Sequence, residues 1–432
     1  MNKFILISSI VLLLSQSLFA NEKKEEESNQ TRFESLSKLT QVIGTIEKYY
    51  VDDIKLQEIV NKSLKGLMQE LDAHSTYLDK KSSKEMSIQT QGEFGGLGIT
   101  VGMRDGALTV ISPIDGTPAY KAGVKSGDII LKIDESSTLN MTLDEAVSLM
   151  RGKPKTPIAL TLVREGENKP LKIDIIRDII KVQSVFSKTI ENEDLLYVRV
   201  SSFDRKVTKN LKKAIKDNPE IKGIILDLRN NPGGLLTQAI GVVDLFVDEG
   251  VIVSQKGRNI EEEEKFNATI TETSTDVPVV VLVNGGSASA SEIVSGALQD
   301  HKRAVVIGEK TFGKGSVQAI LPITQDRSEN IKITIAKYYL PSGRTIQATG
   351  ITPDVISHEG EVVPERNAEF KLKEADLKKH LEVELDKENG NKEEKKTKEN
   401  EDNDKVLTSE DISKDNQLNT AIGIIKSLII MK

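Results

Sequence analysis

The sequence lacks several residue types, and each absence excludes a kind of chemistry. No cysteine occurs among the 432 residues, so disulfides, thiolate metal sites, thiol nucleophiles and a lipidated N-terminal cysteine are excluded. Tryptophan is also absent, and four histidines are too few to favour a multi-histidine metal site. Lysine and arginine (59) are outnumbered by aspartate and glutamate (66), so the basic surface typical of nucleic-acid-binding proteins is not expected.

Long apolar runs are scarce too, with one exception at the N-terminus. Lys3 precedes a mostly apolar run, residues 4–14, and Ala20 ends the short stretch that follows. This pattern is typical of a secretory signal peptide, here residues 1–20. The competing interpretation is an uncleaved anchor, because Leu18 is not the small residue expected near a cleavage site, although a membrane span needs about 20 apolar residues. Both interpretations predict export to the periplasm or cell envelope.

The rest of the chain is long enough for two to three domains of about 100–200 residues each. A polar leader (21–32) precedes a segment whose apolar residues recur at helical spacing (33–90). Short β-like runs separated by turn signals follow at 91–178. Strands then alternate with helices at 179–365, which predicts a mixed α/β fold with a largely parallel sheet, and a charged tether and final helix occupy 366–432. The strands expected in the α/β part are 195–200, 223–228, 277–283 and 304–307, and the helices are 207–216, 235–246 and 291–300.

A glycine-rich run opens the β-rich segment. Gly95, Gly96 and Gly98 surround Leu97, directly before a predicted strand that begins at Ile99. Glycines let successive backbone amides face one side, where they can bind the C-terminal carboxylate of a peptide that adds alongside the strand. A glycine turn without a ligand explains the run alone equally well. The run does not match a phosphate-binding loop, which needs Gly-Lys-Ser/Thr.

A second run of small residues, 284–291, lies between a predicted strand and a predicted helix. Its serines, Ser287, Ser289 and Ser291, would lie beside helix-terminal amides that can stabilise an oxyanion. The alternative is that one of them caps the helix with help from Glu292. The pattern alone does not choose a nucleophile among the three.

A serine nucleophile needs a general base, and the sequence offers histidine and lysine. His301 lies in a polar helix-to-strand loop and His74 ends the N-terminal helices, so neither is favoured. Lys314, flanked by glycines, is the stronger candidate, although lysine becomes a useful base only if burial lowers its pKa from about 10.4 to about 7–8. For Lys310 and Lys314 the alternative is ordinary surface charge. Gln318, four residues on, would lie close to Lys314 only if the chain turns there.

A third segment, Asp-Leu-Arg-Asn-Asn-Pro-Gly-Gly at 227–234, follows another predicted strand. The carboxyl ends of parallel strands are where α/β folds place their sites. An amide of Gly233 or Gly234 could therefore supply part of an oxyanion hole, although Pro-Gly-Gly is also a common way to turn a chain.

These segments together resemble known families. Segments 112–119, 122–124 and 127–130 are similar to a PDZ domain over residues 92–177. The order of PDZ segment, Pro-Gly-Gly turn, serine run and Gly-Lys-Gly-x-x-Gln resembles the C-terminal processing peptidases, also called carboxy-terminal or tail-specific proteases, from about residue 33 to 364.

The resemblance implies a crotonase/ClpP-like protease core with an inserted PDZ domain and an N-terminal helical segment. By motif, Ser289 is the nucleophile, Lys314 is the general base and Gln318 positions the lysine ammonium. The oxyanion donors implied are the amides of Ala290 and Gly233, with Gly234 as the alternative to Gly233. The loop implied to receive the substrate C-terminus consists of Gly96, Leu97, Gly98 and Ile99.

The resulting expectation is an exported serine endopeptidase with a Ser–Lys dyad, an acyl-enzyme intermediate and no metal or other cofactor. Its expected partners are unfolded or tail-exposed proteins, an adaptor, and a second copy bound through the N-terminal helices and the final helix (415–430), with no nucleic acid. The main alternative is a catalytically inactive PDZ-containing scaffold. A crotonase-type enzyme acting on acyl thioesters is disfavoured because export and a PDZ segment do not suit intracellular substrates.

Overall fold

The computed structural model describes most of the chain in two compact units. The predicted signal peptide, nearly all of the leader and most of the tether lie outside the described residues. No helix in the described part is both long and apolar enough to cross a membrane. The described residues are 31–104, 106–258, 263–270, 275–362 and 406–432. The two units are residues 1–83 with 318–334, and residues 84–317 with 335–432.

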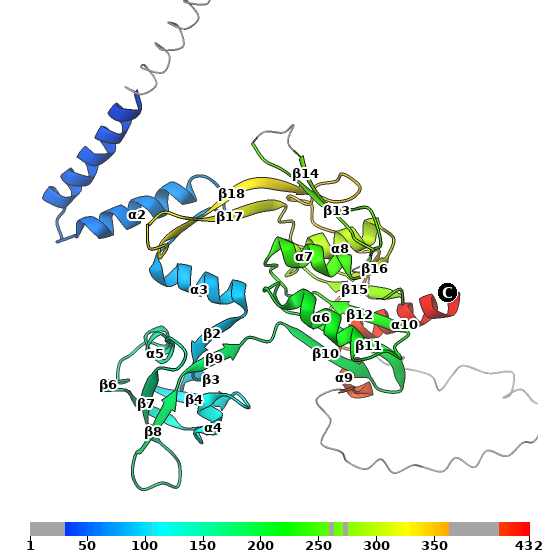
Figure 1. The fold of residues 1–432 in the computed structure, drawn as a ribbon, viewed down its shortest axis with the longest axis horizontal. Coiled ribbons are helices and arrows are strands. Elements are labelled where there is room, and N and C mark those ends of the chain that lie inside the picture. The colour runs from blue at the N-terminus through cyan, green and yellow to red at the C-terminus, as the bar shows by residue number, and fades with distance from the viewer. Residues whose placement is uncertain (1–30, 105, 259–262, 271–274, 363–405) are drawn as a thin grey trace, which may run out of the picture. The chain divides into compact units, whose positions relative to one another are not determined.

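The first unit combines N-terminal helices with one end of a β-hairpin (Figure 1). A helix over residues 31–49 and α2 (Leu56–Gln69) confirm the predicted helical segment. Strand β1 (Thr76–Leu78) pairs antiparallel with β18 (Asn330–Tyr339). Burial and a hydrogen bond from the Tyr77 hydroxyl to the Glu329 carboxylate (2.7 Å) raise the pKa of Tyr77 to about 12.

The β-rich part of the second unit has the predicted strand-and-turn texture. Thr142 caps its principal helix, because the Glu145 amide donates to the Thr142 hydroxyl (3.3 Å) and the Thr142 amide donates to the Glu145 carboxylate (2.8 Å). A buried ion pair between Asp128 and Arg164 (2.7 Å) ties the turn before one strand to the end of another. The helices and strands of this β-rich part are α3 (Lys80–Gln91), β2 (Glu93–Gly96), β3 (Ile99–Arg104), β4 (Ala107–Pro113), α4 (Pro118–Lys121), β5 (Ile129–Ile133), β6 (Ser136–Ser137), α5 (Leu143–Met150), β7 (Pro157–Val163), β8 (Leu171–Ile176) and β9 (Asp178–Lys181).

The α/β part of the second unit is built on a seven-stranded sheet with the order β19-β16-β15-β12-β11-β10-β20. The five strands from β11 to β19 run parallel, and β10 is antiparallel to β11. The sheet therefore confirms the predicted mixed α/β fold with a largely parallel sheet. Its strands are β10 (Val185–Ile190), β11 (Glu193–Val200), β12 (Gly223–Asp227), β15 (Val279–Val283), β16 (Ala304–Gly308), β19 (Val355–Ile356) and β20 (Val406–Leu407).

Helices cover both faces of this sheet because its strands are apolar on both sides. Ile224 and Leu226 pack in one buried cluster, with α6 (Val207–Lys216), α7 (Leu236–Asp244) and α8 (Ala290–Asp300). The intervening Ile225 packs in another cluster, with the final helix. This alternation follows from the two-residue period of a strand. The remaining elements are β13 (Val251–Lys256), β14 (Glu263–Asn267), β17 (Ser316–Pro322), α9 (Ser409–Ser413) and α10 (Asn416–Met431).

The final helix α10, red in Figure 1, docks on the sheet of its own chain. A buried cation anchors its first turn, because Arg229 donates to Asp415 (2.7 and 2.9 Å) and to Gln417 (3.0 Å) while it also binds Asp227 (2.6 Å). Burial alone would raise the pKa of Asp415, but the hydrogen bonds and charge of Arg229 and the amides of Leu418 and Gln417 together outweigh burial and lower the pKa. The apolar side chains that α10 buries are Leu418, Ala421, Ile422 and Ile425.

Candidate active site

The carboxyl ends of β12 and β15 bring two of the sequence motifs together. The strands are neighbours, with Asp227 opposite Leu282, so the Pro-Gly-Gly turn and the serine run emerge side by side. Hydrogen bonds join the two loops, since the Ala288 amide donates to the Asn231 carbonyl (3.0 Å). The motifs therefore meet at the sheet edge where α/β folds carry their sites.

The structure separates the three serines of the run. Ser287 and Ser291 are fully buried and donate their hydroxyls to backbone carbonyls, at Leu228 (2.8 Å) and Asn231 (2.9 Å). Ser289 is 7% exposed and has a left-handed backbone, with φ at 54°. A non-glycine residue held there is strained, and such strain is concentrated at functional sites. Two serines therefore hold the loops together, and Ser289 has the geometry of a nucleophile.

Backbone amides beside Ser289 can stabilise negative charge. Ala290 is the first residue of α8, and its amide donates no hydrogen bond in the described part of the chain. A Cβ on Gly233 would lie 2.9 Å from the Ser289 Cβ and 3.0 Å from the Ala290 nitrogen, so glycine is required for this approach. The Gly233 amide donates to the Asn231 side-chain oxygen (2.9 Å), whereas no described residue accepts from the Gly234 amide. The oxyanion role expected of these amides stays a prediction.

The loop between β16 and β17 (residues 309–315), called the lysine loop because it contains Lys314, is joined to the nucleophile segment by one buried carboxylate. Glu292, fully buried in the first turn of α8, accepts the amides of Ser289 (2.8 Å), Gly313 (2.7 Å) and Lys314 (2.8 Å). It also accepts the hydroxyl of Thr311 (2.5 Å). The backbones of the expected nucleophile and the expected base are therefore tied to a single side chain.

His301 lies too far along α8 from Ser289 to act as its base. His301 follows the last residue of α8 and Ser289 precedes its first, so 11 helical residues separate them. At about 1.5 Å per residue, that helix spans roughly 16 Å. The His301 ring nitrogen instead contacts the Val251 carbonyl (2.8 Å), so this residue is half-buried against β13 and is not the solvated loop residue expected.

Gln318 belongs to the first compact unit, which includes residues 318–334. It lies in the strand β17, so the chain from Ser316 onward is extended and lacks the turn on which the sequence argument depended. Its side-chain amide donates to the hydroxyl of Thr334 (3.3 Å), which in turn donates to Asp72 (3.2 Å). Its role towards lysine stays a prediction.

The glycine-rich loop before β3 has the form of a carboxylate receptor. Leu97 is buried, and a Cβ on Gly98 would lie 2.3 Å from the Thr117 Cβ, at a left-handed φ of 76°. Within the described ranges, the amides of Leu97 and Gly98 donate no hydrogen bond. These amides are available to an anion, together with the apolar start of β3 at Ile99, and Gly96 ends β2 just before them.

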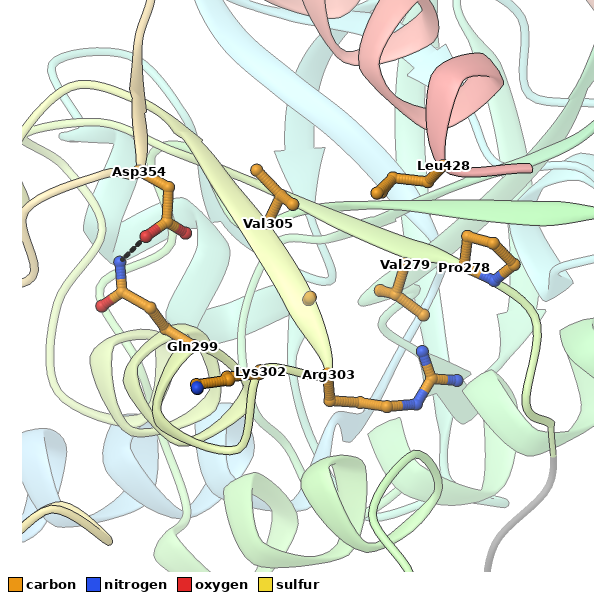
Figure 2. A pocket seen from close by; sticks show the side chains of 9 residues that line it. Pro278, Val279, Gln299, Lys302, Arg303, Val305, Asp354 and Leu428 are labelled. Atoms are coloured by element: carbon orange, nitrogen blue, oxygen red, sulfur yellow. Dashed lines mark hydrogen bonds between the residues drawn. The ribbon is translucent and has the colours of Figure 1, made fainter. Parts of the chain in front are cut away.

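A separate hollow of about 370 Å³ opens at the opposite, amino-terminal end of β15 and β16 (Figure 2). Several of its polar groups are already engaged, since Gln299 donates to Asp354 (2.8 Å) and Asp354 also accepts the Val306 amide (2.8 Å). Arg303 donates to three backbone carbonyls nearby. This hollow is remote from Ser289 along the strands and has no nucleophile.

Sequence reasoning missed the importance of Glu292 and Asn231. Glu292 was considered only as an assistant to a helix cap, and Asn231 only as part of a turn. A signal existed for Glu292, because an acid followed directly by an apolar run (Ile293, Val294) is buried and must find several donors. Its donors could not be named from the sequence, since they lie about twenty residues further on.

The chain is similar in sequence to several known proteins. The model of peptidase family S41 matches residues 194–357, and that of the PDZ domain matches residues 95–175. A carboxy-terminal-processing protease of Bartonella bacilliformis is 42% identical over 87% of this chain and 86% of its own length. The carboxy-terminal processing protease CtpA of Bacillus subtilis is 36% identical over 81% of this chain and 74% of its own. A solved photosystem II D1 C-terminal processing protease is 24% identical, with a TM-score of 0.42, and the match covers 74% of this chain and 92% of that one. At the identity and coverage of the Bartonella relative, the chain belongs to peptidase family S41, among the carboxy-terminal-processing proteases.

Proposed function

We propose that this protein is an exported serine endopeptidase that cleaves protein chains selected by their C-terminal ends, through a Ser–Lys dyad. The observation that carries the proposal is the single carboxylate of Glu292, which receives the amides of both Ser289 and Lys314. Membership of family S41 supports a serine-type peptidase with protein substrates. Export rests on the signal-like segment, residues 1–20.

In the proposed mechanism the Ser289 hydroxyl attacks the peptide carbonyl. Lys314, neutral at that moment, takes the hydroxyl proton and then gives it to the departing amine. The amides of Ala290 and of Gly233 or Gly234 stabilise the negative charge on the carbonyl oxygen. Water then releases the acyl group from Ser289, with Lys314 again accepting a proton.

Substrate selection is assigned to the loop before β3. The unbonded amides of Leu97 and Gly98 suit a terminal carboxylate, and a peptide laid along β3 would extend the sheet. Neither site requires a metal or an organic cofactor.

A second copy of the chain is proposed to cover the first helix. Phe33, Leu36, Leu39 and Val42 recur at three-residue spacing on it and are each about half exposed or more. Such a stripe is expensive to leave in water. The final helix, in contrast, buries its apolar residues on its own sheet, so the proposed dimer uses the N-terminal helix. Velocity sedimentation of residues 21–432 should give a dimer that Leu36→Glu dissociates; a monomeric parent that binds an added protein would indicate an adaptor instead.

The central test is proteolysis of an unfolded protein. Fluorescein-labelled β-casein should be cut by the chain lacking residues 1–20, and both Ser289→Ala and Lys314→Ala should reduce the rate at least about 10³-fold, as loss of a nucleophile or its base does. Lys310→Ala is the matched control and should cut normally, because Lys310 is exposed. If all variants cut alike, the dyad is wrong. If the parent never cuts, with or without a C-terminal peptide added, the inactive-scaffold alternative is favoured.

A further inference from the structure

We propose that Glu292 is a positioning residue that sets the spacing between the nucleophile loop and the lysine loop. The proposal rests on the function proposed above. It concerns a residue that does not contact the reacting atoms and acts through the backbones of Ser289 and Lys314.

The four hydrogen bonds of Glu292 are divided between its two oxygens. Oε2 accepts the amides of Ser289 and Lys314, each at 2.8 Å. Because both bonds end on one atom, the two amide nitrogens lie within twice that length of each other. Oε1 accepts the Thr311 hydroxyl (2.5 Å) and the Gly313 amide (2.7 Å). The carboxylate is thus saturated by donors from segments about twenty residues apart.

The lysine loop has no regular secondary structure of its own between β16 and β17. It is held from one side by the segment near Ile351, whose amide donates to the Thr311 hydroxyl (2.7 Å), and by the Ala348 amide, which donates to the Gly313 carbonyl (2.8 Å). On the other side, the Phe312 amide donates to the Ser287 carbonyl (3.1 Å), and Glu292 adds three bonds between the loop and the nucleophile segment.

Capping of α8 alone would not require the hydrogen bonds that Glu292 accepts from the lysine loop. A capping carboxylate satisfies amides of its own helix, and Glu292 does so only once, at Ser289. Its other three donors come from the lysine loop. A buried carboxylate with this set of donors resists displacement, because each lost bond leaves charge unsolvated in the interior. Dyad chemistry depends on such rigidity, since a misplacement of about 1 Å can cost about 10²-fold in rate.

The test compares Glu292→Gln with Glu309→Gln, the same chemical change in a carboxylate whose hydrogen-bond partner within the described ranges is the exposed ring of His358 (3.1 Å). Both variants are made in the chain lacking residues 1–20, and β-casein cleavage is measured for kcat and KM separately, with the melting temperature recorded alongside. We expect Glu292→Gln to lower kcat about 10²-fold with KM within about twofold, and Glu309→Gln to resemble the parent.

A second pair keeps the proposal testable if Glu292→Gln does not fold. Thr311→Val removes one donor to Glu292, and Thr311→Ser restores the hydroxyl. We expect about a tenfold lower kcat for the valine variant and near-parental kcat for the serine variant.

The outcomes separate the two proposals. A parent that cuts while Ser289→Ala does not, combined with normal kcat in Glu292→Gln or equal kcat in both Thr311 variants, overturns the positioning role and leaves the peptidase intact. A lower melting temperature with unchanged kcat also overturns it, because that is the result of a purely structural role. A parent without activity overturns both.

Discussion

Two loops of this protein present backbone amides at the start or end of a strand, and they use them in opposite ways. The first lies at the carboxyl ends of β12 and β15, called the catalytic edge because the proposed nucleophile Ser289 lies there. Here the amides of Ser289 and Lys314 donate to Glu292, and the amide of Gly233 donates to Asn231. In the loop before β3, the amides of Leu97 and Gly98 have no internal acceptor among the described residues.

This difference in hydrogen bonding indicates different roles for the two loops. An amide with an internal acceptor holds the backbone in one shape, whereas an unbonded amide is available to a ligand. At the catalytic edge the geometry is fixed and few amides, such as that of Ala290, are left over for an oxyanion. In the loop before β3, Leu97 is buried and Gly98 lies close against Thr117, and the proposal assigns the remaining amide donors to an incoming carboxylate.

The largest effect should come from adding a methyl group at the catalytic edge. Gly233→Ala places a Cβ 2.8 Å from the Ala288 carbonyl oxygen and 2.9 Å from the Ser289 Cβ, at a φ that alanine avoids. We expect kcat for β-casein to fall at least about 10²-fold, because the nucleophile must move. Gly285→Ala, in the same serine run with open space around it, is the control and should stay active. Equal kcat for both variants would show that the edge is not rigid.

A smaller and different effect is expected in the loop before β3. Gly98→Ala would collide with Thr117, and the loop would lose the shape that presents its amides. We expect about tenfold weaker binding of an apolar C-terminal peptide, measured by fluorescence anisotropy, with kcat near the parental value. Gly116→Ala shares the left-handed φ but meets no neighbour, so it controls for backbone strain. A fall in kcat without a change in peptide binding would contradict the division of labour.

The smallest effect should come from behind the catalytic edge, at the anchor of α10. The pKa of Asp415 is lowered in the fold, so its contribution to stability is complete above the unfolded pKa of about 3.9 and is lost as pH falls through the folded value. Asp415→Asn should lower the melting temperature at pH 7 by about 5 °C and abolish this acid dependence.

Hydrogen exchange sharpens the comparison further. In Asp415→Asn, exchange should rise at residues 229–234, next to the anchored arginine, and stay unchanged at Leu97 and Gly98. Parallel increases in both loops would mean that they do not behave as separate structures.

The fold was largely predictable because its signals are local. The helix predicted at 207–216 is α6 with the same bounds, and apolar runs marked the four parallel strands to within a few residues. Likewise, the glycine at 98 was recognisable from its neighbours. The candidate site was predictable as a set of motifs, through family resemblance and not through spacing.

What could not be predicted depends on contacts between distant segments. Glu292 gave no sign of its partners at Thr311, Gly313 and Lys314, because which loop crosses which is decided by the sheet order. The conformation around Gln318 could not be chosen from the sequence for a related reason: pairing of β17 with β18, a tertiary contact, makes the chain extended from Ser316 onward. Burial of Arg229 likewise required a carboxylate 186 residues later.

The 186-residue separation between Arg229 and Asp415 has a consequence for the order in which the protein folds. Asp415 and Gln417 are synthesised 186 and 188 residues after Arg229. Until they arrive, Arg229 lacks two of the three side chains to which it donates, and one face of the central sheet lacks its covering helix. Contacts between such distant residues also form slowly, because a long loop must close first. The anchor of Arg229, four residues before Gly233, is therefore expected to form late in folding, after the nearer contacts of the sheet.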